Sequence, residues 1–74
     1  MITAGDIVRF NGQYTYCGIE RHGMLGLVDY TFEDEDGWCA TVTEYLGTYR
    51  DGTPAYSHLG IPLPLKDLEP AGTP

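Results

Sequence analysis

The sequence predicts an all-β domain of five or six short antiparallel strands. Strand-forming Tyr, Val and Thr dominate the stretch between a Gly-Asp pair at 5–6 and a Leu-x-x-Leu pair at 65–68. The ten glycines are scattered singly, as turns and bends require, and no helical periodicity extends beyond one turn. We expect the 74 residues to form one domain, with its core over about residues 5–70 and a frayed tail over 71–74.

The N-terminal elements follow from alternation and turn residues. Residues 6–10 alternate apolar and polar side chains, and the Asn-Gly pair at 11–12 is the strongest two-residue hairpin signal. Residues 13–20 continue as a second strand, so these two strands are expected to pair. The third strand spans 24–32, and Gly26 inside it indicates a bulge or a sharp bend.

The C-terminal elements follow from the same signals. A strand is expected over 38–46, and the turn formers at 50–54 predict a hairpin tip between aromatic flanks. Residues 61–65 alternate apolar residues with prolines, a pattern typical of an edge strand or a closing segment. A single 3₁₀ or helical turn is expected near 65–68.

The predicted core consists of the side chains that alternation places on one face of each strand. Trp38 belongs to it because Ala40 and Val42 continue its face at period 2. The full predicted core is Val8, Phe10, Cys17, Ile19, Val28, Tyr30, Trp38, Ala40, Val42, Ile61, Leu63, Leu65 and Leu68.

Net charge narrows the classes of partner. Eleven acidic residues against four basic ones leave the chain at −7, which repels phosphate backbones, so direct nucleic-acid binding is not expected. A basic protein is the complementary partner, although acidity can simply keep a small domain soluble. No apolar run approaches the roughly 18 residues that span a bilayer, and no signal-peptide pattern opens the chain. We therefore expect a cytoplasmic protein with no membrane partner.

The cysteines and histidines give no catalytic or metal motif. Cys17 and Cys39 stand alone, outside any Cys-x-x-Cys pair, and are expected as reduced, apolar residues. In an exported chain they could instead be bridged. His22 and His58 lie in predicted turns or loops. We therefore expect no cofactor, no metal and no catalytic residue within one monomer.

The candidate binding residues are tyrosines outside the predicted core and a run of carboxylates. Tyrosine is enriched at interfaces because it offers a large contact area at low entropic cost. The carboxylates lack the ligand spacing of an EF-hand. A solvated loop and tyrosines with half-buried rings are the alternatives. The candidates are Tyr14, Tyr16, Tyr45, Tyr49, Tyr56, Glu33, Asp34, Glu35 and Asp36.

The layout over residues 5–70 resembles an SH3-like barrel, and its outline is most similar to the type B plasmid dihydrofolate reductases. The opening Gly-Asp-Ile-Val-Arg at 5–9 and the closing Pro-Leu-Lys-Asp-Leu-Glu at 64–69 resemble that family's two ends. Where the family lines a tetrameric pore with Val-Gln-Ile-Tyr, this chain has Gly-Ile-Pro-Leu at 60–63. Ile61 and Leu63 replace the polar side chains that engage folate and nicotinamide. The resemblance therefore implies a barrel, self-association and a mobile-element or phage origin, without catalytic residues.

Three functional hypotheses follow from these observations. The first is a non-catalytic acidic binding module that contacts a protein partner through its tyrosines and its acidic loop. The second is an oligomeric enzyme whose site forms between subunits. The third is an acidic nucleic-acid mimic that inhibits a basic protein. Self-association in a homo-oligomer is expected because a chain of this length has little core of its own.

Overall fold

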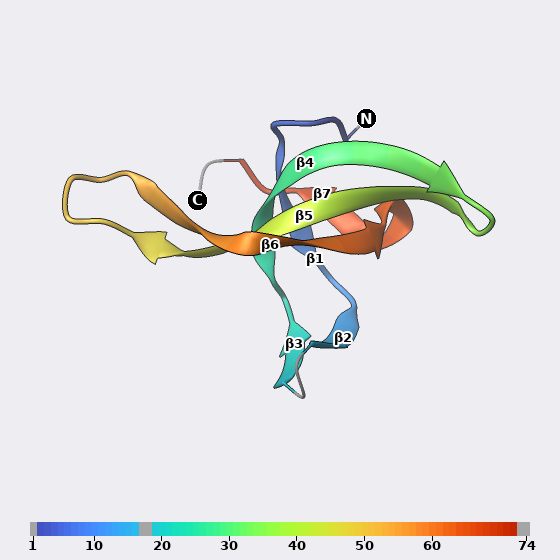
Figure 1. Ribbon diagram of the computed structural model, residues 1–74, viewed down its shortest axis with the longest axis horizontal. Coiled ribbons are helices and arrows are strands. Elements are labelled where there is room, and N and C mark those ends of the chain that lie inside the picture. Colours follow the sequence, from blue (N-terminus) through green and yellow to red (C-terminus); the bar gives the residue numbers. More distant parts are fainter. Residues whose placement is uncertain (1, 17–18, 73–74) are drawn as a thin grey trace.

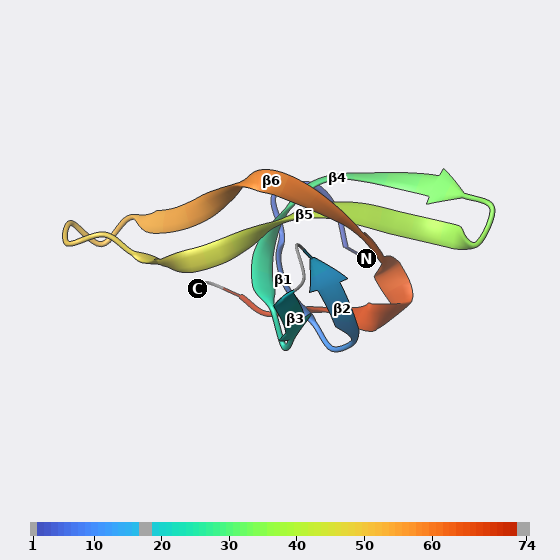
Figure 2. The ribbon, with the colours of Figure 1, turned by 60° about the horizontal axis from the view of Figure 1, so that its bottom comes forward.

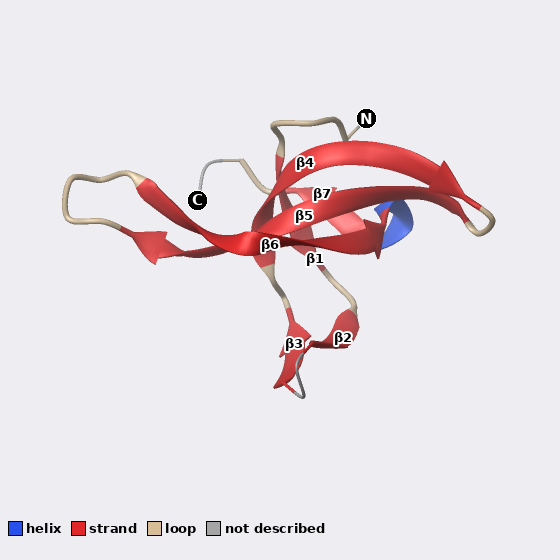
Figure 3. Ribbon diagram, in the orientation of Figure 1, coloured by secondary structure: helices blue, strands red, loops and turns tan. Residues whose placement is uncertain are grey.

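The computed structural model describes residues 2–16 and 19–72, which form strands and one 3₁₀ turn (Figure 3). The all-β class, the antiparallel pairing and the single turn near the C-terminus are confirmed. Ala71 N–H donates to Ile7 O at 2.9 Å, so residue 71 is attached to the first strand. The elements are β1 Ile7–Phe10, β2 Gln13–Tyr16, β3 Ile19–His22, β4 Leu25–Asp34, β5 Gly37–Thr48, β6 Pro54–Pro64, η1 Leu65–Asp67 and β7 Leu68–Pro70.

Five strands form one antiparallel sheet in the order β6-β5-β4-β1-β7, and β2 and β3 form a separate hairpin. Figures 1 and 2 show that hairpin projecting from the main sheet. The expected pairing of residues 6–10 with 13–20 is therefore wrong, because β1 lies between β4 and β7. Asn11 N–H donates to Asp67 O at 2.9 Å, so the Asn-Gly pair leads the chain out of the sheet instead of reversing it.

The core lies on one face of the main sheet, around β1 and the middle of β5. Seven predicted core residues are buried, and Ile61 and Leu65 pack against them half-buried. Predicted core residues Cys17 and Ile19 lie outside the side chains that the structure describes. The buried apolar residues are Ile2, Val8, Phe10, Met24, Val28, Ala40, Val42, Leu63 and Leu68.

Tyr30 does not belong to the core, because the register of β4 against β5 shifts just before it. Val28 lies opposite Val42, whereas Tyr30 lies opposite Thr41, so Asp29 is an extra residue on β4. Opposed residues of antiparallel strands share a face, so the bulge turns Tyr30 away from Val42. The Tyr30 side chain is 57% exposed.

Trp38 is also wrongly assigned to the core, although alternation places it on the face of Ala40. The pairing of β5 with β6 ends at Cys39 and Pro64, so Trp38 has only β4 as a neighbouring strand, where it faces Glu33. Its side chain is 48% exposed. Period-2 alternation predicts the face of a residue, and the extent of the neighbouring strands sets its depth.

Gly26 marks the point where β4 lies between β1 and β5 at close range. It pairs with Val8 on one side and Glu44 on the other. A Cβ at this position would lie 2.5 Å from Val42 Cγ1 and 2.7 Å from Thr43 O. The predicted bulge does not lie at Gly26, where the pairing is regular on both sides, but three residues later at Asp29.

β5 and β6 continue past the last β4 pair as a two-stranded ribbon, which we call the arm (residues 45–59) and which Figure 1 shows at the left. Its tip is closed by Tyr49 N–H donating to Thr53 O at 2.8 Å and Gly52 N–H donating to Tyr49 O at 3.0 Å. The predicted hairpin tip is therefore confirmed.

Candidate binding site

The predicted acidic loop is a tight turn between β4 and β5, and we call residues 33–36 the acidic turn. Glu33 and Asp34 end β4, and Asp34 pairs with Gly37 at the start of β5. Glu35 and Asp36 form the reversal, where Asp36 N–H donates to Asp34 Oδ1 at 2.8 Å. Gly37 takes φ +121°, which L side chains rarely adopt. All four carboxylates are exposed at one tip of the molecule.

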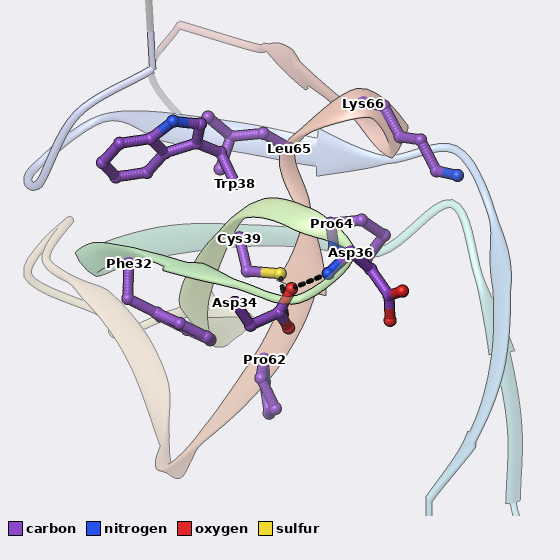
Figure 4. A pocket seen from close by; sticks show the side chains of 9 residues that line it. All are labelled: Phe32, Asp34, Asp36, Trp38, Cys39, Pro62, Pro64, Leu65 and Lys66. Carbon is purple, nitrogen blue, oxygen red and sulfur yellow. Dashed lines mark hydrogen bonds between the residues drawn. The ribbon is translucent and has the colours of Figure 1, made fainter.

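An open pocket of about 800 Å³ lies beside the acidic turn. In Figure 4, Trp38 and Leu65 lie on one side of it, and Phe32 and Pro62 lie on the other. Most of its lining is apolar, while carboxylates and one ammonium group provide the charge. The lining residues are Phe32, Asp34, Asp36, Trp38, Cys39, Pro62, Pro64, Leu65 and Lys66.

Strand register explains why these residues meet. Phe32 lies opposite Cys39, and Cys39 lies opposite Pro64, so three adjacent strands place one residue each in the same row. Proline is tolerated in β6 because an edge strand does not need every N–H for the ladder. η1 then turns back at the end of β6 and adds Leu65 and Lys66.

The Cys39 thiol is held in its neutral form within this pocket. Its pKa is raised above 9.0 by partial desolvation, by the hydrogen bond to Asp34 and by the negative charges of Asp34 and Asp36. Cys39 Sγ donates to Asp34 Oδ2 at 3.4 Å. Because the thiolate is the reactive form, this cysteine is a poor nucleophile and a poor metal ligand. Cys39 is a free thiol, and Cys17 lies outside the described residues.

The electrostatic balance of the pocket is acidic. Asp34 and Asp36 line it, Glu33 and Glu35 are exposed in the same turn, and Lys66 is the opposing cation. Figure 4 shows the Asp36 carboxylate and the Lys66 ammonium group extending from the same side. The site therefore combines apolar surface with excess negative charge.

Three of the candidate tyrosines lie on the arm. Tyr45 and Tyr56 face each other across β5 and β6, with ring centroids 6.0 Å apart in an edge-on arrangement. Both are half-buried, and the Tyr45 hydroxyl hydrogen-bonds the Thr48 hydroxyl. Tyr49 at the tip is 64% exposed.

The acidic turn and the arm lie at opposite ends of the molecule (Figure 1), whose longest extent is 42 Å. The structure therefore brings the four carboxylates together, and it brings Tyr45 and Tyr56 together, but it separates the two groups. Tyr14 and Tyr16 lie in β2, and their side chains are outside those described.

Sequence reasoning missed the aromatic and proline residues of the pocket. Alternation places Trp38 on the core face, and the alternating prolines predict an edge position for Pro62 with no binding role. Phe32 had no signal, because its position beside Cys39 depends on the bulge at Asp29. Adjacency of Trp38 to the acidic run was the one available clue.

Other sites for chemistry are limited in the part of the chain that the structure describes. Residues 2–16 and 19–72 contain no group of three His, Cys, Asp or Glu side chains that could hold a metal ion. His58 is exposed on β6. Within the same residues, no helix has the length and apolarity needed to cross a membrane.

Comparisons with known proteins add no family. No family model matches the chain, and neither a curated protein nor a solved structure matches it. The resemblance to SH3-like barrels and to type B reductases therefore stays an expectation from sequence.

Proposed function

We propose that this chain is a non-catalytic binding module, which receives a basic and partly apolar segment of a protein partner in the pocket beside the acidic turn. The observation that carries the proposal is the pairing of a half-exposed Trp38 with the carboxylates of Asp34 and Asp36 in one open pocket. A large exposed apolar side chain costs solubility, so its combination with charge favours a binding role.

The chemistry of the pocket favours an arginine or lysine side chain. An indole face attracts a cation by roughly 0.5–1 kcal/mol at an exposed site. The aliphatic stem of the same side chain can pack on Phe32 and Pro62, while its charged end meets Asp36. Tyrosine, tryptophan and arginine are enriched at binding hot spots, where apolar packing and polar contacts occur together.

The net negative charge of the chain favours a basic protein over a nucleic acid as the partner. The chain carries a net charge of −7, and four of its eleven carboxylates lie in the acidic turn at the pocket, so a nucleic acid would be repelled. Steering by such a field raises the association rate with a basic partner more than it raises affinity. The between-subunit enzyme and the nucleic-acid mimic stay predictions without a further observation in their favour.

Trp38 is the only tryptophan of the chain and reports on its own pocket. A capped heptapeptide that alternates arginine with leucine is titrated while the tryptophan emission is followed. We expect saturable binding that is tighter than that of an arginine–glycine heptapeptide. A glutamate–leucine heptapeptide should not bind. Equal binding of all three peptides would contradict the proposal.

Matched charge variants separate the pocket from the general acidity of the chain. Asp36→Asn removes a lining carboxylate and keeps the N–H that donates to Asp34. Glu69→Gln removes an exposed carboxylate that does not line the pocket. We expect about a fivefold loss of affinity for the first and little change for the second, as a lost contact of roughly 1 kcal/mol gives. Equal losses would show binding by net charge alone.

A further inference from the structure

The arm has no third strand beside it in the described structure. The last pair of β4 with β5 is Gly26 with Glu44, so residues 45–48 of β5 pair only with β6. A two-stranded ribbon is marginally stable in water, because it buries little apolar area on either face. Packing of another surface on the arm would therefore stabilise it.

The arm also carries most of the large apolar side chains that the described structure leaves exposed. Leu46 is 61% exposed, Tyr49 is 64% exposed and Leu59 is 51% exposed. The two others, Tyr30 and Trp38, lie elsewhere on the sheet. Exposed apolar side chains that gather in one region of a surface are typical of interaction sites.

Charge indicates what covers the arm. Residues 45–59 contain one basic residue, Arg50, and one acidic residue, Asp51, so the whole net charge of −7 lies outside the arm. Two copies of this chain repel one another over most of their surfaces. The arm is the surface on which they can approach at low electrostatic cost.

We propose that the arm is a self-association surface, on which two copies of this chain pack about a two-fold axis. In such an interface residue i meets residue j and j meets i. The adjacent Arg50 and Asp51 are then self-complementary, because each Arg50 meets the partner's Asp51. Leu46, Tyr49 and Leu59 supply the apolar contact. This surface is distinct from the pocket at the other end of β5.

The size of the arm limits the strength of the dimer. Its 15 residues fall below the roughly 20–30 residues that a standard interface uses on each side. We expect a dissociation constant on the order of 10 µM. Added salt should strengthen the dimer, since it screens the repulsion between the acidic bodies and leaves the apolar contact intact.

Sedimentation velocity of the full chain tests the proposal from about 5 to about 500 µM, a range that spans the expected dissociation constant. We expect a concentration-dependent rise from 8.2 kDa to twice that mass, and a larger dimer fraction in 0.5 M than in 0.05 M NaCl, about a threefold change in Debye length. Leu46→Arg should raise the dissociation constant at least tenfold, although it lowers the net negative charge. Leu59→Arg is the second variant. Thermal melts of both at low concentration confirm folding.

Two controls decide where the contact lies. Tyr30→Arg makes the same change of charge at an exposed tyrosine outside the arm, and Trp38→Ala changes the pocket. Neither substitution should weaken dimerisation. A species of 8.2 kDa under every condition would overturn the proposal. Loss of the dimer in Trp38→Ala, or its weakening by salt, would overturn it in favour of an arm tip docked in another copy's acidic pocket. Peptide binding by the pocket is measured separately, so the two proposals can fail independently.

Discussion

The two ends of β5 share one strand and differ in what surrounds them. At the pocket end, β4 and β6 flank Cys39, and η1 closes over the side of the strand. At the arm end, only β6 accompanies residues 45–48. Between them, Ala40 and Val42 are fully buried. Along β5, alternation sets which face a residue occupies, and the number of neighbouring strands sets how deeply that face is buried.

The largest expected loss of stability comes from adding a side chain at Gly26, where β4 lies close to β5 between the two ends of that strand. Gly26→Ala would place a Cβ 2.5 Å from Val42 Cγ1 and 2.7 Å from Thr43 O, and the backbone oxygen cannot move aside cheaply. We expect a loss of about 3 kcal/mol or more, in line with overpacking of a close-packed core. Urea unfolding followed by circular dichroism measures it.

Gly60→Ala is the matched control for that substitution. Its Cβ would lie 2.3 Å from Thr41 Cγ2 and 3.2 Å from Asp29 Oδ2, and both atoms are ends of side chains that can change rotamer. We expect less than about 1 kcal/mol of destabilisation. If both variants lost equal stability, the packing of β4 between β1 and β5 would not be the limiting feature.

Substitutions of the exposed residues at the two ends of β5 should change the free energy of unfolding by smaller amounts. Trp38→Ala should cost about 1–2 kcal/mol, because its half-exposed indole buries only part of its area. Leu46→Ala should stay within about 0.5 kcal/mol, as surface substitutions do. Thermal unfolding of the two variants at low protein concentration measures both. A loss of about 3–5 kcal/mol for Trp38→Ala would return that residue to the core.

The smallest effect concerns the tip of the arm. The Thr53 hydroxyl and N–H donate to Asp51 Oδ1 at 2.6 and 3.0 Å, and these hydrogen bonds lower the pKa of Asp51 below 3.8. Because the pKa of Asp51 is lower in the folded state than in the unfolded state, its carboxylate stabilises the fold at pH values above the unfolded-state pKa. This stabilisation is lost as the pH falls through the folded-state pKa. The Thr53 amide resonance should therefore titrate below pH 3.8. Thr53→Ala removes the side-chain hydrogen bond that lowers the Asp51 pKa most, so the titration midpoint of Asp51 should rise. In this variant the titration is followed at the Gly52 amide resonance.

How much of this fold could be predicted from sequence depends on the range of the signal. The tip at 50–54 follows from Gly and Asp residues that act over a few neighbouring positions. The Asn-Gly pair at 11–12 is an equally local signal, yet it does not form a hairpin between β1 and β2. The reason is that β1 pairs with β4 and β7, where Val8 and Phe10 are buried. This burial removes more apolar area from water than pairing with a neighbouring hairpin strand would.

The sequence by itself determined the all-β class, the 3₁₀ turn near residue 65, most of the core and the acidity of the turn at 33–36, because these depend on alternation, proline and charge. Only the tertiary structure decided that Trp38 is exposed, that Tyr30 faces outward and that Phe32, Cys39 and Pro64 meet in one row. The physical reason is that a single extra residue at Asp29 reverses every later face of β4, and that burial depends on strands far away in the chain.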